Sequence, residues 1–160
     1  HHLLDIDRAD GIDTLAGGGP IECACQSSTK APGVRCLTAG DRSNVDTALS
    51  RLTAWHDTVI LDCPPGVGPD AVRPLRHARQ ALVVSTDQPE SLADARTTAQ
   101  TARQLGTAVA GTIIRATADD TQPNWSGESP VFSTDSVETP LTNPQTRETW
   151  RGVIRQLLAP

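Results

Sequence analysis

Aromatic residues are scarce in this sequence: they make up 2% of its 160 residues, and tyrosine and methionine are absent altogether. A core must therefore be built from aliphatic Val, Ile, Leu and Ala side chains, because few rings are available to fill it. At this length the chain fits one domain and can bury a sizeable core of that kind.

Long apolar runs and an excess of positive charge are also missing. No run approaches the roughly 20 apolar residues that a membrane-spanning helix needs, and no secretory signal pattern opens the chain. The net charge is −5, and Lys30 is the only lysine among 14 basic residues. This balance argues against a nucleic-acid binder that works by bulk charge.

Cysteine pairs at metal-ligand spacing are absent as well. Cys23 and Cys25 form a C-x-C pattern, but no second His or Cys pair completes a zinc-type ligand set. Buried reduced thiols are favoured over a metal site, and a cytoplasmic location follows as the default expectation. The chain also starts without methionine, and residues 3–6 already have the apolar character of a strand. We expect the domain to be N-terminally incomplete.

Short apolar runs alternate with segments of helical period, which is typical of a parallel sheet covered by helices on both faces. The glycines and serines between them mark the helix ends: Ser43 and Ser91 are predicted N-caps, and Gly106 is a predicted C-terminal stop. The predicted helices are 12–16, 43–55, 71–78, 91–105 and a last one from Pro144. The predicted strands are 2–7, 33–40, 57–62, 80–86, 108–116 and a short 130–134.

Two of these predicted strands end in carboxylates. Residues 2–7 (HLLDID) end in Asp5 and Asp7, and VILD ends in Asp62. Ligands of parallel sheets collect at the carboxyl ends of the strands, and Mg²⁺ prefers oxygen ligands and keeps several waters. The sequence therefore predicts a magnesium site at this edge, against the alternative of solvated strand ends.

The sequence after Asp62 predicts a stiff backbone followed by a tight turn. Pro64 and Pro65 restrict the backbone, and Gly66 allows a tight turn whose exposed N–H group can meet an anion such as a terminal phosphate. An acidic strand end followed by such a turn suits a metal–phosphate pocket.

These motifs resemble the MinD/ParA group of P-loop ATPases, also called the deviant Walker A group. LLDIDRADGIDTLAG is similar to the first switch of that group, and VILDCPPGVG to its Walker B and second-switch segment. ALVVSTDQPESLADARTTAQTARQLGTAVAGTIIR is similar to the strand–helix–strand that follows, and GVRCLTAG to a strand with a terminal Gly turn. The resemblance covers residues 1–116 well and 130–158 loosely.

The resemblance implies a P-loop NTPase-like fold and a role for each of these residues. Asp7 is expected to orient the attacking water, and Asp5 and Asp62 to hold Mg²⁺ of a bound Mg²⁺–ATP. Gly66, after Pro64 and Pro65, is expected to report the terminal phosphate. Proteins of this group hydrolyse ATP between two subunits of a homodimer and position division sites, chromosomes, plasmids or cargo.

The departures from the group are as informative as the matches. The Gly-rich phosphate loop ending in Gly-Lys-Thr is not in the sequence, since Lys30 is followed by Ala31 and Pro32. The resemblance places that loop and its strand before the D-x-D segment and in the middle of the sheet. Without them we expect no ATP turnover by this chain alone, and exposed apolar side chains beside the gap. Arg115 stands at the position where proteins of this group often have an Asn that binds adenine. The identity of the bound nucleotide therefore stays open.

Two other interpretations of the chain remain. The chain is alternatively a degenerate relative that acts as a protein-interaction module, or, less well supported, a response-regulator-like phosphate binder, for which Lys30 is misplaced. DNA or membrane surfaces are weaker candidate partners than a regulatory or cargo protein. A solvated helix surface is favoured over a DNA-binding face, and a core-covering last helix over a membrane-targeting stripe at 150–158. The candidate DNA-binding residues are Arg73, Arg76, His77, Arg79, Arg96 and Arg103.

Overall fold

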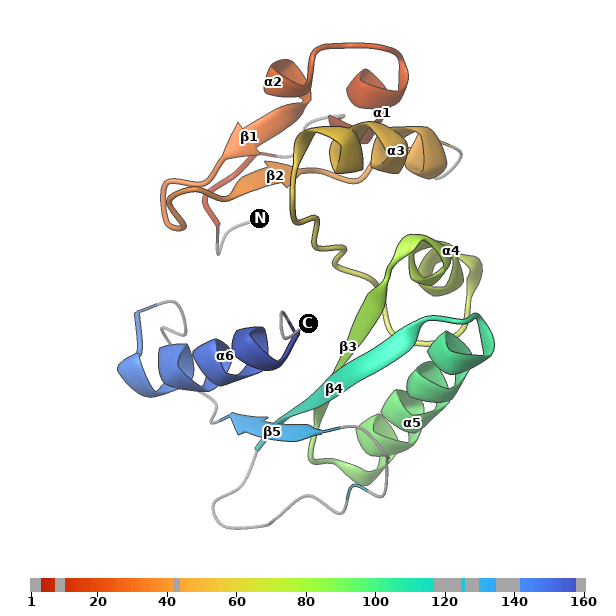
Figure 1. Ribbon diagram of the computed structural model, residues 1–160, viewed down its shortest axis with the longest axis vertical. Helices are drawn as coiled ribbons and strands as arrows, with labels where there is room; N and C mark the ends of the chain where they lie inside the picture. The colour runs from red at the N-terminus through yellow and green to blue at the C-terminus, as the bar shows by residue number, and fades with distance from the viewer. Residues whose placement is uncertain are drawn as a thin grey trace. The chain divides into compact units, whose positions relative to one another are not determined.

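The computed structural model describes residues 4–7, 11–41, 44–116, 125, 130–134 and 142–157 (Figure 1). The chain divides into two compact units, His1–Leu61 and Asp62–Pro160. Each unit is described by itself below. Within the described residues, no helix is long and apolar enough to cross a membrane.

The first unit consists of short helices around a two-stranded antiparallel sheet. Its elements are α1 (Gly11–Ala16), α2 (Ile21–Ala24), β1 (Cys25–Ser27), β2 (Arg35–Leu37) and α3 (Val45–Trp55). Gln26 lies opposite Cys36 in the sheet. Helices this short have a large share of unpaired terminal carbonyls, and arginines bind them here. Arg35 donates to the carbonyls of Ile21, Glu22 and Cys25 at 3.3–3.4 Å, and Arg51 donates to that of Leu15.

The core of the first unit is aliphatic, as the lack of aromatic residues predicts. Apolar side chains from α1, α2 and α3 meet, with Val59 and Leu61 packed against them. The apolar positions of α3 recur at helical spacing and give it one buried face. The buried residues are Leu15, Ile21, Ala24, Cys25, Ala48, Leu49 and Leu52.

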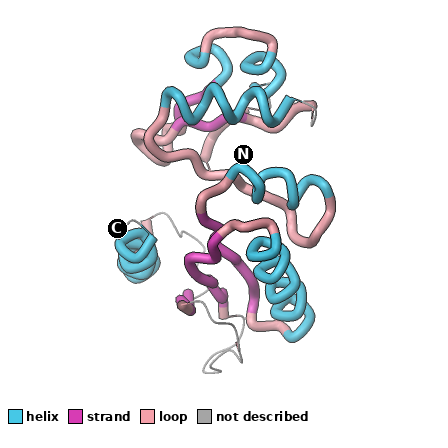
Figure 2. The backbone as a smooth tube through the Cα atoms, turned by 45° about the vertical axis from the view of Figure 1, so that its right-hand side comes forward, coloured by secondary structure: helices cyan, strands magenta, loops and turns pink. Residues whose placement is uncertain are grey.

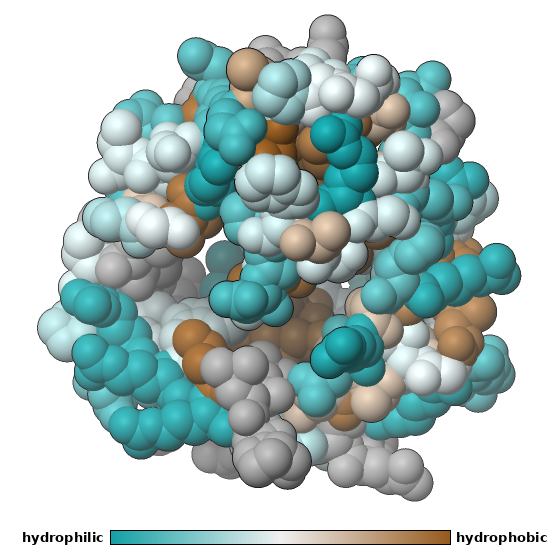
Figure 3. Space-filling view, turned by 45° about the horizontal axis from the view of Figure 1, so that its top comes forward, coloured by the Kyte–Doolittle hydropathy of each residue, from teal (hydrophilic) through white to brown (hydrophobic). Residues whose placement is uncertain are grey.

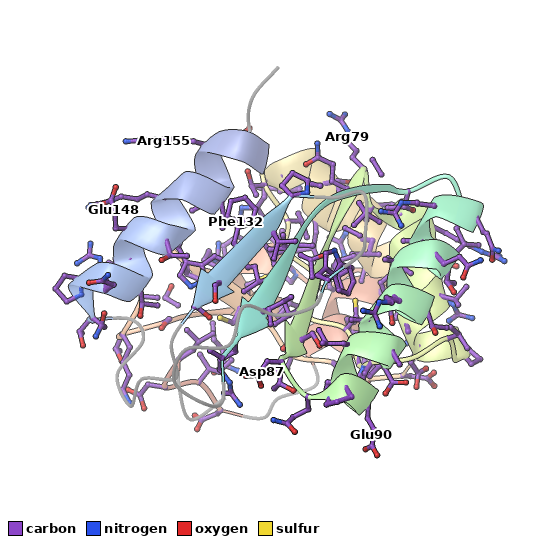
Figure 4. All side chains as sticks on the ribbon, turned by 90° about the horizontal axis from the view of Figure 1, so that it is seen from below. Arg79, Asp87, Glu90, Phe132, Glu148 and Arg155 are labelled. Carbon is purple, nitrogen blue, oxygen red and sulfur yellow. The ribbon has the colours of Figure 1, made fainter. Side chains whose placement is uncertain are left out.

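The second unit is a three-stranded parallel sheet with a helix on each face. Its strands β3 (Gln80–Thr86), β4 (Ala108–Arg115) and β5 (Val131–Thr134) are adjacent in that order. Helix α5 (Pro89–Gln104) packs on β3 and β4, and α6 (Pro144–Leu157) lies along β4 and β5. Figures 2 and 4 show these two helices on opposite faces, and α4 (Pro69–His77) contacts α5.

Side-chain alternation assigns the two faces of this sheet. Val83 packs with Ala95 and Ala99 of α5, and Trp125 covers this cluster while the Arg96 guanidinium lies 5.7 Å from the centre of its ring. Successive strand residues point to opposite faces, so Val84 faces away from α5, and its side chain is 65% exposed. The other edge of β3 pairs with no strand among the described residues.

Most predicted elements of the second unit are confirmed. The structure has the strands predicted at 80–86, 108–116 and 130–134, and the helices predicted at 71–78, at 91–105 and from Pro144. Ser91 is not the N-cap of α5, because the helix starts at Pro89 after Gln88. A proline at the first helical position loses no hydrogen bond and begins the helix earlier. In α6, Val153 is fully buried while Trp150 and Ile154 are partly exposed.

Two strands predicted for the first unit are wrong. Residues 57–62 form no strand: Val59 and Leu61 pack inward and Ile60 is 89% exposed, but no ladder partner is present among the described residues. Residues 4–7, the described part of the 2–7 prediction, are not a strand either. The pattern at 33–40 does give a strand, but β2 has three residues and runs antiparallel.

Of the other predictions for this part, the helix at 12–16 corresponds to α1, and the helix at 43–55 to α3, where Trp55 is 65% exposed. Residues 2–3, Ser43, most of 117–129, and Leu158 lie outside the described residues. The face in Figure 3 is mostly hydrophilic, with hydrophobic residues in small groups.

A pair of glycine substitutions tests the C-terminal end of α5. The N–H groups of Gly106 and Thr107 bind the carbonyls of Arg103 and Ala102 at 3.0 and 2.9 Å, and Gly106 has φ +83°. We expect Gly106→Ala to lower the free energy of unfolding by about 1 kcal/mol, because a Cβ strains the left-handed conformation. The matched control is Gly152→Ala within α6, where open space surrounds the new methyl group. It should raise stability by about 0.5–1 kcal/mol. Urea unfolding measures both, and equal effects would contradict the assignment.

Candidate functional site

The D-x-D segment in the first unit is held by side chains of β1 and the residues that follow it. Gln26 binds the backbone of Asp7 twice, accepting its N–H at 2.9 Å and donating to its C=O at 3.0 Å. Ser28 donates to the carbonyl of Leu4 at 2.6 Å, and Thr29 donates to the Asp5 carboxylate at 2.7 Å. Both aspartates are exposed. The carboxylates are therefore presented to solvent from a backbone that is fixed in place.

The backbone at Asp5 has an unusual conformation. Its φ is +54°, and no other non-glycine residue of the described chain has a positive φ. Aspartate is one of the few side chains that tolerate this left-handed region. Leu4 and Asp5 form a turn, so the described part of the predicted strand is not a strand.

Asp13 joins α1 to the residues after β2. Its carboxylate accepts the Asp41 N–H at 2.9 and 3.1 Å and the Asn44 side-chain amide at 3.0 Å. Thr38 adds two more bonds, its carbonyl accepting the Ile12 N–H at 3.1 Å and its hydroxyl the Gly11 N–H at 3.3 Å. The glycine turn of GVRCLTAG is thereby fastened to the helix that follows the D-x-D segment.

The Asp62-x-Pro-Pro-Gly segment leads into α4 of the second unit. Asp62, Pro64 and Pro65 are exposed. Gly66 has φ +98°, and no atom lies within 4 Å of the place where its Cβ would be. The chain bends at Gly66, with open space beside this glycine. Gly68 is the residue before the helix and Pro69 occupies its first turn.

Cys63 lies inside this segment without being a reactive thiol. Burial raises the pKa of the Cys63 thiol, and the negative charge of Asp62 raises it further. Burial also raises the pKa of Cys25 in the first unit, with Arg35 opposing it. Both thiols are protonated at neutral pH, because the shift is upward from an ordinary value that already lies above 7. Neither is suited to nucleophilic chemistry.

Arg115 ends β4 at the carboxyl edge of the parallel sheet. Its carbonyl accepts the Asp87 N–H at 3.3 Å, so the ends of β3 and β4 stay together past the last ladder pair. The Arg115 side chain is exposed. Figure 4 shows Asp87 at this edge and Glu90 at the start of α5.

The predicted site residues thus fall into two groups. Asp5 and Asp7 belong to the first unit, and Asp62, Pro64, Pro65, Gly66 and Arg115 to the second. Lys30 is exposed in the connection between β1 and β2. Within the described residues, no three His, Cys, Asp or Glu side chains form a metal-binding group. Because Mg²⁺ commonly takes one or two carboxylates and completes its shell with water and phosphate, this does not count against a Mg²⁺–nucleotide site.

Gln26 and Asp13 were not predicted from the sequence. Gln26 is 19 residues from Asp7, and Asp13 is 28 and 31 residues from Asp41 and Asn44. The only signal for Asp13 is the Gly40 turn that it contacts, and nothing in the local pattern marks Gln26.

Comparisons with known proteins find a curated relative and solved structures that resemble this chain. No protein-family model matches the chain. An uncharacterised ATP-binding protein of Methanocaldococcus jannaschii is 28% identical over 141 residues, which are 82% of this chain and 50% of that protein. The chain thus spans about half the length of this curated relative.

Two solved structures have the same fold. The Pyrococcus furiosus cell division ATPase MinD matches with a TM-score of 0.62 and 23% identity, covering 98% of this chain and 70% of that one. The septum site-determining protein MinD of Pyrococcus horikoshii, complexed with Mg-ADP, matches with a TM-score of 0.62 and 20% identity, covering 96% and 69%. The chain is MinD-like in fold. The resemblance and the P-loop NTPase-like α/β fold predicted from the sequence are confirmed.

A double-mutant cycle tests the contact between Asp13 and Gly40. A Cβ on Gly40 would lie 2.7 Å from the Asp13 carboxyl carbon, so Gly40→Ala should lower the free energy of unfolding by about 1–3 kcal/mol. In an Asp13→Ala background the same substitution should cost less, with a coupling of about 0.5–3 kcal/mol. Denaturant unfolding of the four proteins gives the coupling directly. Additive effects would show that the turn does not lie on the carboxylate.

Proposed function

We propose that residues 1–160 form part of a MinD/ParA-like ATPase that switches between nucleotide states and serves intracellular positioning. Placing a division site, a chromosome, a plasmid or a cargo is the kind of work that the resemblance implies. The MinD-like fold and the similarity to an ATP-binding protein support an ATPase of this type. The observation that carries the proposal is that both acidic segments expose their carboxylates, and that side chains of the first unit hold the D-x-D segment in place.

The residues present fit part of a Mg²⁺–ATP site. Asp5 and Asp62 offer exposed carboxylate oxygens, the ligand type that Mg²⁺ prefers. Gly66 offers a left-handed turn with open space beside it, which suits the approach of a phosphate to the backbone. The cradle of backbone N–H groups and the lysine of a phosphate loop are not among the 160 residues. The chain therefore supplies the part of such a site that holds Mg²⁺ and contacts the terminal phosphate.

In this proposal each residue acts through position and charge. Asp7 orients the attacking water, Asp5 and Asp62 hold the hydration shell of the cation, and the Gly66 N–H donates to the terminal phosphate. Pro64 and Pro65 keep that turn in place. Arg115, at the carboxyl end of β4, lies beside the bound nucleotide. Mg²⁺–ATP supplies the phosphoryl group and the counter-charge of the reaction.

The domain, assembly and location follow as parts of the same proposal. The 160 residues form one MinD/ParA-like domain that is N-terminally incomplete. In the second unit, the exposed Val84 and the edge of β3 that pairs with no strand among the described residues support a sheet with one strand more than those described. The working protein is a cytoplasmic homodimer that binds a regulatory or cargo protein, with a membrane or nucleoid surface as a further site of action.

A second candidate function is a non-catalytic interaction module. The Arg115–Ala116 pair at the position where the group often has an adenine-binding Asn favours it. This module would keep the fold and bind a partner protein without hydrolysing ATP. The two candidates differ in whether the whole natural protein turns over ATP.

Substitution of Asp62 in the whole natural protein tests the ATPase. We expect Asp62→Asn to reduce Mg²⁺-dependent ATP hydrolysis by about 100-fold or more, because the charge that holds the cation is lost. The control is Asp57→Asn, which changes an exposed carboxylate at the other end of the same segment and should leave the rate unchanged. Phosphate release under saturating ATP measures both. A folded wild-type protein without ATPase activity would favour the interaction module.

Calorimetry on residues 1–160 tests the account of the phosphate loop. We expect no heat of binding on titration with Mg²⁺–ATP, because the backbone N–H groups that would cradle the phosphates are not in this chain. The same titration of the whole natural protein should show saturable binding. Tight binding by residues 1–160 alone would mean that another segment forms the anion cradle.

A further inference from the structure

Residues 4–7 have no backbone ladder of their own. A strand in a sheet is held by N–H and C=O partners along its length, whereas the described part of this segment is turn and irregular backbone. Among the described residues, its partners are instead side chains of one neighbouring strand and its extension: Gln26, Ser28 and Thr29. The position of the two aspartates therefore depends on side-chain contacts.

Gln26 has the most specific geometry of the three. Its primary amide accepts from the Asp7 N–H at 2.9 Å and donates to the Asp7 C=O at 3.0 Å. A primary amide presents a donor and an acceptor side by side, as a peptide strand does where two antiparallel residues exchange both bonds. The side chain thus takes the place of one ladder pair and fixes the backbone at residue 7 from both sides.

We propose that Gln26 is a positioning residue for Asp7, acting through this paired contact with the Asp7 backbone. The proposal rests on the proposed function, in which the Asp7 carboxylate orients the attacking water. A carboxylate follows its own backbone, because the Asp side chain has only two rotatable bonds. Fixing the N–H and C=O of residue 7 therefore limits the places that its oxygens can reach. Thr29 restrains the other aspartate directly through its carboxylate.

The exposure of these bonds favours a role in orientation over one in stability. Both bonds to Asp7 are solvent-exposed, and water competes for such groups, so each contributes little net stability. An error of about 1 Å in the placement of a reacting group can cost about 100-fold in rate. Loss of the amide pair should consequently appear in turnover before it appears in unfolding.

The first experiment measures the contact itself in the whole natural protein. Gln26→Leu keeps the size of the side chain and removes both polar groups, and Gln100→Leu makes the same change at an exposed position of α5. We expect hydrogen exchange at the Asp7 amide, followed by NMR, to become roughly tenfold faster in Gln26→Leu only. The amides of the β1–β2 ladder should keep their protection, which separates loss of the contact from unfolding. Unchanged exchange at Asp7 would overturn the proposal.

The second experiment measures the consequence for turnover in the whole natural protein. We expect Gln26→Leu to lower kcat for ATP about 10- to 100-fold with KM within about twofold of wild type, because binding is kept and orientation is lost. Gln26→Glu keeps an acceptor for the Asp7 N–H but turns an acceptor toward its C=O, so its kcat should fall between the two. Equal kcat values for wild type and Gln26→Leu would overturn the positioning role.

The two experiments separate this inference from the function on which it rests. If the wild-type protein hydrolyses ATP and Gln26→Leu changes neither exchange nor kcat, the inference fails and the ATPase stands. If the wild-type protein has no ATPase activity while exchange at Asp7 responds to Gln26→Leu, the contact stands and both the proposed function and the catalytic meaning of the contact fail.

Discussion

Every extended segment of this chain needs partners for its backbone N–H and C=O groups, and the source of those partners decides how each segment behaves. In the second unit, β3, β4 and β5 bind one another in parallel register and form a rigid layer between α5 and α6. Residues 57–62 have no regular secondary structure, and no strand pairs with them among the described residues. Residues 4–7 bind side chains instead of a neighbouring strand. The candidate functional residues lie where the ladders end or are replaced.

This difference explains how far the sequence could predict the fold. The β3–α5–β4 portion follows from local pattern, because each apolar run has its partner close by in sequence and each helix has a clear start or stop. The predictions failed at 57–62 and at residues 4–7, where a short apolar run was present but no ladder partner is found among the described residues. A short apolar run shows which side chains can be buried; it does not say that a neighbouring strand exists. The antiparallel β1–β2 pair was missed because three-residue strands give too few positions for a period.

The candidate site likewise has features that the local sequence predicts and contacts that it does not. Acidic residues after apolar runs, and a proline-rich turn ending in Gly66, are local patterns, and the left-handed Gly66 is where the sequence places it. Gln26 and Asp13 act at distances of 19 to 31 residues along the chain. Their contacts depend on how α1, β1 and the Gly40 turn come together, which no single stretch of sequence encodes. Polar side chains that bind backbone across such distances become visible only when the fold is known.

The two candidate functions make different demands on the D-x-D segment. A surface that binds a partner protein needs complementary shape over many residues, and its rim tolerates side chains that move. A carboxylate that orients a water must be held to within a fraction of an ångström. Gln26, Ser28 and Thr29 each bind one residue of the segment 4–7, and Gln26 and Ser28 do so through its backbone atoms alone. A contact set that restrains the backbone while leaving both carboxylates exposed fits the second demand, and on that physical ground the ATPase is the better supported of the two.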